Sequence, residues 1–176
     1  MLRLVPFEIC KKMYKHSEFI RRRRAKIGDY YYFIDGDDVR LVHYTRNTPK
    51  SKIPKTRSKK WIWAPKRLDH LLDIADMGCA PNTSVSISQV YPEGFIAMGN
   101  AFRHDVKFQA CAWSIVGITD ERGRPDYAVI IGEGRTRLEA LAKLIIKQGK
   151  AKKKGVIEAE KIMSAAQEAS KDSTYE

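Results

Sequence analysis

The segment 126–149, DYAVIIGEGRTRLEALAKLIIKQG, joins a strand-like run to an amphipathic helix. Residues 126–131 are mostly apolar, aromatic or β-branched, a composition that favours a strand. Thr136 and Glu139 have the spacing of a capping box, in which the two side chains satisfy backbone N–H groups at a helix start. We therefore expect a helix that begins here and ends at Gly149. Its inward positions are Leu138, Leu141, Ala142 and Ile145.

A second helix and further strands precede this segment. Pro65 favours the start of a helix that Gly78 ends, with leucines and alanine at helical spacing between them. Turn-forming residues then separate strand candidates at 84–91, 94–102, 107–119 and 126–131. The order is α-β-β-(β)-β-α. It predicts an α+β fold in which two helices cover one face of an antiparallel sheet of three to four strands.

The N-terminal part is expected to add a basic helix and a hairpin. Pro6 suits the first position of a helix running to about Lys26, and Asp-Gly at 35–36 is a strong turn signal between two strands rich in aromatic and β-branched residues. The predicted organisation has four parts. These are a basic helix and hairpin at 1–44, a basic arm at 45–60, the α-β-β-β-α domain at 61–149 and a basic helical tail at 150–176.

Length and composition restrict the class of protein. The chain has 176 residues and a formal net charge of +12, which suits one principal domain with basic extensions. Its three cysteines lack the spacing of a disulfide framework or a zinc site. The N-terminal apolar run is too short for a signal peptide, and no stretch is long and apolar enough to span a membrane. We expect an intracellular, cytoplasmic protein.

Charge is distributed unevenly along the chain. Residues 39–68 contain ten lysines and arginines and no acidic residue, whereas residues 69–142 contain six basic and ten acidic residues. A run of this kind stays extended and solvated unless a polyanion neutralises it, and a phosphate backbone is the obvious counterpart. The candidate nucleic-acid-binding residues are Arg21, Arg22, Arg23, Arg24, Arg46, Lys50, Lys52, Lys55, Arg57, Lys59, Lys60, Trp61, Trp63, Arg135 and Arg137.

Three groups among these candidates have alternative interpretations. Four successive arginines, 21–24, suit a helix C-terminus but exceed what capping requires. Trp61 and Trp63 have the spacing of an edge strand that clamps the arm to the domain, or they stack on bases. The glycines and arginines of 132–137 form a strand-to-helix turn, or they present a helix N-terminus to a phosphate.

Nothing in the sequence supports catalysis. The turn Asp35-Gly-Asp-Asp38 resembles the metal-binding turn of viral RNA-dependent RNA polymerases, but acidic hairpin turns form for backbone reasons alone. The four histidines are scattered, and hydrolase and P-loop motifs are absent. We expect no enzyme activity, no metal and no cofactor.

Two resemblances concern the C-terminal part. His104 and Phe108, followed by Gly132-x-Gly134-x-Thr136-Arg137 and Ala140, resemble the later half of a double-stranded-RNA-binding domain. Leu138 and Leu141 stand at two of that family's basic positions.

Over residues 61–148, the leucine helix and the later T-x-x-E-A-L motif resemble small α-β-β-β-α phage accessory proteins. That group includes anti-CRISPR inhibitors of host defence. The resemblance implies a setting in a host cytoplasm.

We therefore expect a non-catalytic protein that binds RNA, DNA or a nucleoprotein. A phage-encoded inhibitor of a host RNA-guided nuclease is the most concrete form of this hypothesis. A protein-interaction module whose basic arm meets an acidic protein surface is the alternative, and a metal-dependent nuclease that uses the acidic turn is a weaker one.

Overall fold

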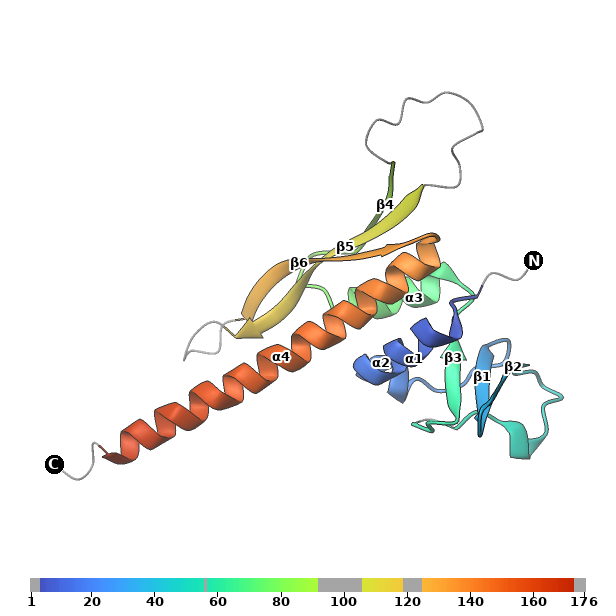
Figure 1. Cartoon of the computed structure of the whole chain (residues 1–176), viewed down its shortest axis with the longest axis horizontal. Helices are drawn as coiled ribbons and strands as arrows, with labels where there is room; N and C mark the ends of the chain where they lie inside the picture. The colour runs from blue at the N-terminus through green and yellow to red at the C-terminus, as the bar shows by residue number, and fades with distance from the viewer. Residues whose placement is uncertain (1–3, 56, 92–105, 119–124, 173–176) are drawn as a thin grey trace.

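The computed structural model describes residues 4–55, 57–91, 106–118 and 125–172 (Figure 1). The fold is α+β, as predicted. The helices are α1 (Phe7–His16), α2 (Glu18–Arg22), α3 (Leu68–Asp76) and α4 (Arg137–Asp172), with a short 3-10 turn, η1 (Lys50–Lys52). The strands are β1 (Tyr30–Asp35), β2 (Asp38–His43), β3 (Trp61–Ala64), β4 (Ser86–Val90), β5 (Lys107–Ile118) and β6 (Pro125–Gly134).

The C-terminal part follows the predicted α-β-β-β-α order as α3, β4, β5, β6 and α4. Its strands form an antiparallel sheet in the order β4-β5-β6. The strand expected at 94–102 lies outside the described residues. Along β5, Ala110, Ala112 and Ser114 are buried while Trp113 between them is exposed. This alternation places one face of the sheet against α4 and leaves the other face in solvent.

Small residues on the covered face let α4 approach the sheet closely. A Cβ atom on Gly132 would lie 2.3 Å from the carbonyl oxygen of Ala140, which no real side chain tolerates. A Cβ atom on Gly134 would lie 2.7 Å from the backbone nitrogen of Ala140. Both glycines lie within β6, and their lack of a side chain allows α4 to pack closely on the sheet. The sequence alone did not predict this role.

The N-terminal part forms a separate sheet in the order β2-β1-β3. The predicted hairpin is confirmed, with Asp35 paired to Asp38 across a turn in which Gly36 has a φ of 60°. Strand β3 pairs with β1 on the other side, so residues 61–64 complete this sheet.

The single N-terminal helix expected between Pro6 and Lys26 is instead broken at Ser17. Ser17 has extended backbone angles, and its Oγ accepts a hydrogen bond from the N–H of Ile20. It thereby caps a new short helix, α2, and satisfies a donor that the break frees. Helix α2 packs against α1 but does not continue its axis. The arginines at 21–24 therefore lie at the end of α2 and in the loop beyond it.

Gly149 does not end the last helix, contrary to the sequence prediction. Helix α4 continues for 36 residues, about 54 Å at the usual rise per residue. Figure 1 shows it running diagonally between β4-β5-β6 on one side and α1, α2 and β2-β1-β3 on the other. A Cβ on Gly149 would lie 2.1 Å from the carbonyl oxygen of His16, so this glycine is the point where α1 meets α4.

One hydrophobic cluster joins the two parts. It includes Met13 of α1, Trp63 of β3 and Leu144 of α4. Within the described ranges, no helix combines the length and the apolarity needed to cross a membrane.

Candidate nucleic-acid interface

Basic residues from three separate segments meet beside the break between α1 and α2. The basic arm reaches this place because the backbone N–H of Arg57 donates a hydrogen bond of 3.2 Å to the carbonyl oxygen of Arg21. Arg57 adopts a φ of 62°, an uncommon conformation for a residue other than glycine. The arm is therefore docked against α2 at this point.

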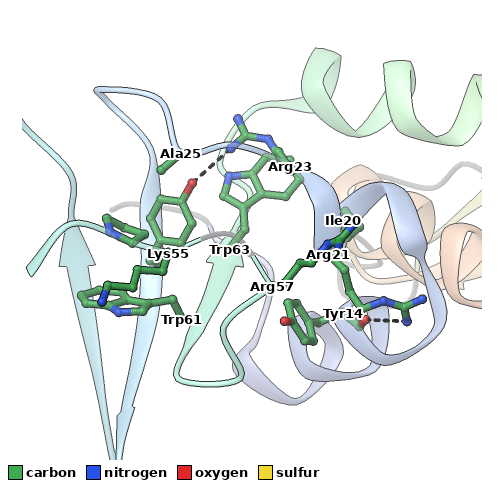
Figure 2. A pocket seen from close by; sticks show the side chains of 11 residues that line it. Tyr14, Ile20, Arg21, Arg23, Ala25, Lys55, Arg57, Trp61 and Trp63 are labelled. Carbon is green, nitrogen blue, oxygen red and sulfur yellow. Dashed lines mark hydrogen bonds between the residues drawn. The ribbon is translucent and has the colours of Figure 1, made fainter.

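Arg21 itself is anchored to the end of α1. Its guanidinium donates hydrogen bonds to the carbonyl oxygens of Lys15, at 2.8 Å, and Tyr14, at 3.4 Å. These carbonyls belong to the last turn of α1, where a cation is favourable. Figure 2 shows Arg21 and Arg57 among the side chains that line one small cavity, together with Tyr14 and Lys55.

The third segment is the middle of α4. The pKa of His16 is lowered, first by burial and then by the positive charges of Lys150, Lys15, Lys153 and Arg21. Two of these cations come from α4 and two from the α1–α2 region. Cations that lie between positions 15 and 153 of the sequence are therefore gathered around this imidazole.

We call this surface the basic band. Its members are Lys15, Arg21, Lys55, Arg57, Lys150, Lys152 and Lys153. Arg21, Lys55 and Arg57 were predicted from the sequence, whereas Lys15, Lys150, Lys152 and Lys153 were not. The signal for the three lysines of α4 was present in the Lys150–Lys154 run, but the expected helix end at Gly149 assigned that run to a tail.

A groove of about 550 Å³ opens next to the band, between α1–α2, α3 and α4. Lys15, Arg21, Lys152 and Lys153 line it, and Glu18 is its one acidic residue among those described. Glu18 is already paired with Arg22 on the next turn of α2. Among the described side chains, the positive charge around the groove is therefore largely uncompensated.

Arg23 lines the same small cavity as Arg21, Lys55 and Arg57, but its guanidinium is engaged in contacts within the fold. Its side chain is largely buried and donates hydrogen bonds of 2.6 and 3.0 Å to the two carboxylate oxygens of Asp29. The same guanidinium donates to the hydroxyl of Tyr31 at 3.2 Å. Such a bidentate pair fixes the loop before β1, so Arg23 has a structural role.

The two tryptophans are also structural. Trp61 and Trp63 are only 9% and 4% exposed, because β3 packs into the core as the edge strand of the N-terminal sheet. The structure agrees with the interpretation as an edge strand, and it leaves little of either ring exposed for stacking on bases.

The remaining candidates are exposed but lie elsewhere. Arg22 and Arg24 flank the buried Arg23, and the outer arm carries the other basic candidates. The structure does not bring this outer group into either of the cavities that the band lines. Its members are Arg46, Lys50, Lys52, Lys59 and Lys60.

Arg135 and Arg137 lie at the start of α4, about 20 Å along the helix from Lys150. One half of the predicted capping box is present there, whereas the Glu139 side chain accepts from Arg135 instead of Thr136. Thr136 Oγ accepts from the N–H of Glu139 at 3.1 Å, and the Glu139 carboxylate accepts from the N–H of Arg135 at 3.1 Å. Burial alone would raise the pKa of Glu139, but hydrogen bonds from Lys143 and from the N–H of Arg135 lower it overall. A protein carboxylate thus already occupies part of this helix terminus.

No group of three or more His, Cys, Asp or Glu side chains gathers as a metal site in the described part of the chain. The acidic turn at 35–38 is exposed, and Asp38 pairs with Arg40 at 3.2 Å. The geometry of the turn agrees with its structural interpretation. No protein-family model, no curated protein and no solved structure matches this chain.

Proposed function

We propose that this protein binds nucleic acid, or a nucleoprotein, without catalysing a reaction on it. One observation carries the proposal, namely the convergence of the arm, the α1–α2 corner and the middle of α4 on the basic band. Folding gathers these like charges at an electrostatic cost. A polyanion that binds along the band offsets this cost and releases its own counterions.

The specific role that we propose is inhibition of a host RNA-guided nuclease. The band would engage the guide RNA, the target DNA or the assembled complex through their phosphates. This role rests on the resemblance of the C-terminal part to phage accessory proteins and on the predicted surface charge. Phosphate contacts position a protein on nucleic acid without reading its sequence, which suits an inhibitor of this kind.

A protein-interaction module is the second candidate, and one feature favours it. The outer face of the sheet β4-β5-β6 exposes Trp113, which is 53% accessible, beside Val129 and Ile131. Apolar groups clustered on a sheet face are typical of protein contacts. In this alternative, the basic band meets an acidic protein surface.

The salt dependence of binding tests the proposal. If five to eight phosphates are neutralised, log K for a labelled oligonucleotide should fall against log[salt] with a slope of roughly −4 to −7. Replacing Lys55, Lys150 and Lys153 with glutamine should flatten this slope by about 2 to 3.

The control removes the same net charge from exposed sites outside the band. Lys12→Gln, Lys66→Gln and Lys107→Gln together should leave the slope nearly unchanged. Equal effects of the two triple variants would show that net charge, not the band, governs binding. Absence of salt-dependent binding by the wild-type chain would refute the proposal.

A further inference from the structure

The groove beside the basic band has an apolar floor as well as a basic rim. Phe19, Ile74, Met77 and Ile145 lie among its lining residues. Its volume of about 550 Å³ falls within the range of sites that hold a small molecule or a few side chains. A groove of this composition suits an occupant that carries both an apolar body and negative charge.

The side chain of Phe19 is the most distinctive part of this floor. It is 43% exposed, and Met77 from α3 is 57% exposed. The Lys152 ammonium lies over one face of the Phe19 ring, 5.9 Å from its centre, so this partly exposed aromatic ring carries a cation beside it. Aromatic rings beside lysines or arginines form stacking platforms for the bases of single strands.

The positive charge continues beyond the groove. Arg21 lines both the groove and the small cavity shared by Lys55 and Arg57, and thereby connects them. An acidic peptide bound in the groove would leave the cations of the arm unmatched, unless its charges also repeated along the band. A strand of nucleic acid has a phosphate at every residue, which matches an extended row of cations.

We propose that the groove takes a base of a single-stranded nucleic acid against Phe19, while the neighbouring phosphates lie along the basic band. This inference rests on the proposed function and adds a preference for single strands to it. A base inside a duplex is stacked and paired, so its faces cannot reach the groove without an energetic penalty. The chain should therefore prefer single strands to duplexes of equal length.

Binding of three labelled ligands tests this inference. These are a single-stranded oligothymidylate, an abasic strand with the same number of phosphates, and a duplex of the same length. Wild-type protein should bind the base-containing strand about tenfold more tightly than the abasic strand, since stacking on one aromatic side chain has an effect of this size. Phe19→Ala should remove most of that difference and leave affinity for the abasic strand unchanged.

Trp113→Ala is the matched control, because it removes an exposed aromatic side chain on the opposite side of the sheet. It should leave all three affinities unchanged. Thermal unfolding of each variant establishes that the fold is retained.

The outcomes separate the inference from the proposed function. Salt-dependent binding that is equal for the base-containing and abasic strands, and unaffected by Phe19→Ala, overturns the groove inference and leaves the band as a phosphate site. Failure of all three ligands to bind overturns both. In that case, a peptide of alternating glutamate and phenylalanine that shifts the amide signals of Phe19 and Lys152 would assign the groove to an acidic protein partner.

Discussion

The guanidinium carbon of Arg23 lies 4.1 Å from the centre of the Trp63 ring (Figure 2). Because the same group is hydrogen-bonded to Asp29, it connects the loop before β1 to the edge strand β3. A planar guanidinium can stack on an indole and bind a carboxylate through two N–H groups at once. Arg23 therefore stabilises the corner against which the basic arm docks.

We predict that Arg23→Lys destabilises the fold by about 1 to 3 kcal/mol, since an ammonium forms neither the bidentate pair nor the flat stack. Arg24→Lys, at the exposed neighbouring position, should change stability by less than about 0.5 kcal/mol. Urea unfolding of both variants measures the difference. Equal stabilities would mean that the buried contacts of Arg23 contribute little.

Gly149 provides a second test of the packing. In an exposed helix, Gly→Ala stabilises by about 1 kcal/mol through helix propensity. At Gly149, the new methyl group would meet the carbonyl oxygen of His16, so we predict net destabilisation by at least 1 kcal/mol or so. Lys150→Ala, one position along and exposed, should have little effect on the melting temperature. An increase in melting temperature for Gly149→Ala would contradict the close approach of α1 and α4.

The α-β-β-β-α order was predictable because its signals are local. Helix periodicity, turn residues and the Thr136–Glu139 capping box each act over a few positions, and all agree. The hairpin before residue 44 was predictable for the same reason. For Trp61 and Trp63, an edge strand was one of two predicted alternatives, and the pairing of β3 with β1 favours it.

Other features depend on contacts between distant segments. A glycine at position 149 has the usual signature of a helix end, and only the approach of His16 explains its place inside α4. Ser17 followed by Glu18 is a capping signal that a continuous apolar pattern obscured. The basic band depends on both features, because the break turns Arg21 toward α4 and the uninterrupted helix carries Lys150 and Lys153 past it. A linear charge count cannot reveal this surface.

The pKa of His16 is a direct probe of the band. Burial contributes most to its lowering, and the charges of Lys150, Lys15, Lys153 and Arg21 contribute the rest. We predict that Lys150→Gln with Lys153→Gln raises the pKa of His16 part of the way toward its usual value. An NMR titration of the imidazole measures it. Lys12→Gln serves as the control, and an unchanged pKa in the double variant would place the two lysines too far away to act on His16.

The same shift has a consequence for stability. Because the folded-state pKa of His16 is lowered, the unfolded chain binds a proton more readily in the interval just below its ordinary pKa of about 6.5. Stability should therefore fall as the pH decreases through this interval. His16→Gln should reduce that dependence.

At the start of α4, a structural residue, Thr136, lies between two candidate binding residues, Arg135 and Arg137. Thr136→Ala should cost about 0.5 to 2 kcal/mol, since the N–H of Glu139 loses its acceptor. Arg135→Gln with Arg137→Gln should change melting less than Thr136→Ala does, because both side chains are exposed and the contact of Arg137 with the Phe108 ring, at 5.8 Å, is at the surface.

The effect of the two arginines on binding is the decisive measurement. We predict that their replacement weakens oligonucleotide binding, but less per charge than replacement of Lys150 and Lys153, because the Glu139 carboxylate already accepts the N–H of Arg135 at that helix terminus. Affinity and melting temperature should be measured on the same preparations. If the double arginine variant loses as much stability as Thr136→Ala and keeps full affinity, these arginines belong to the scaffold, and the helix N-terminus is not an anion site.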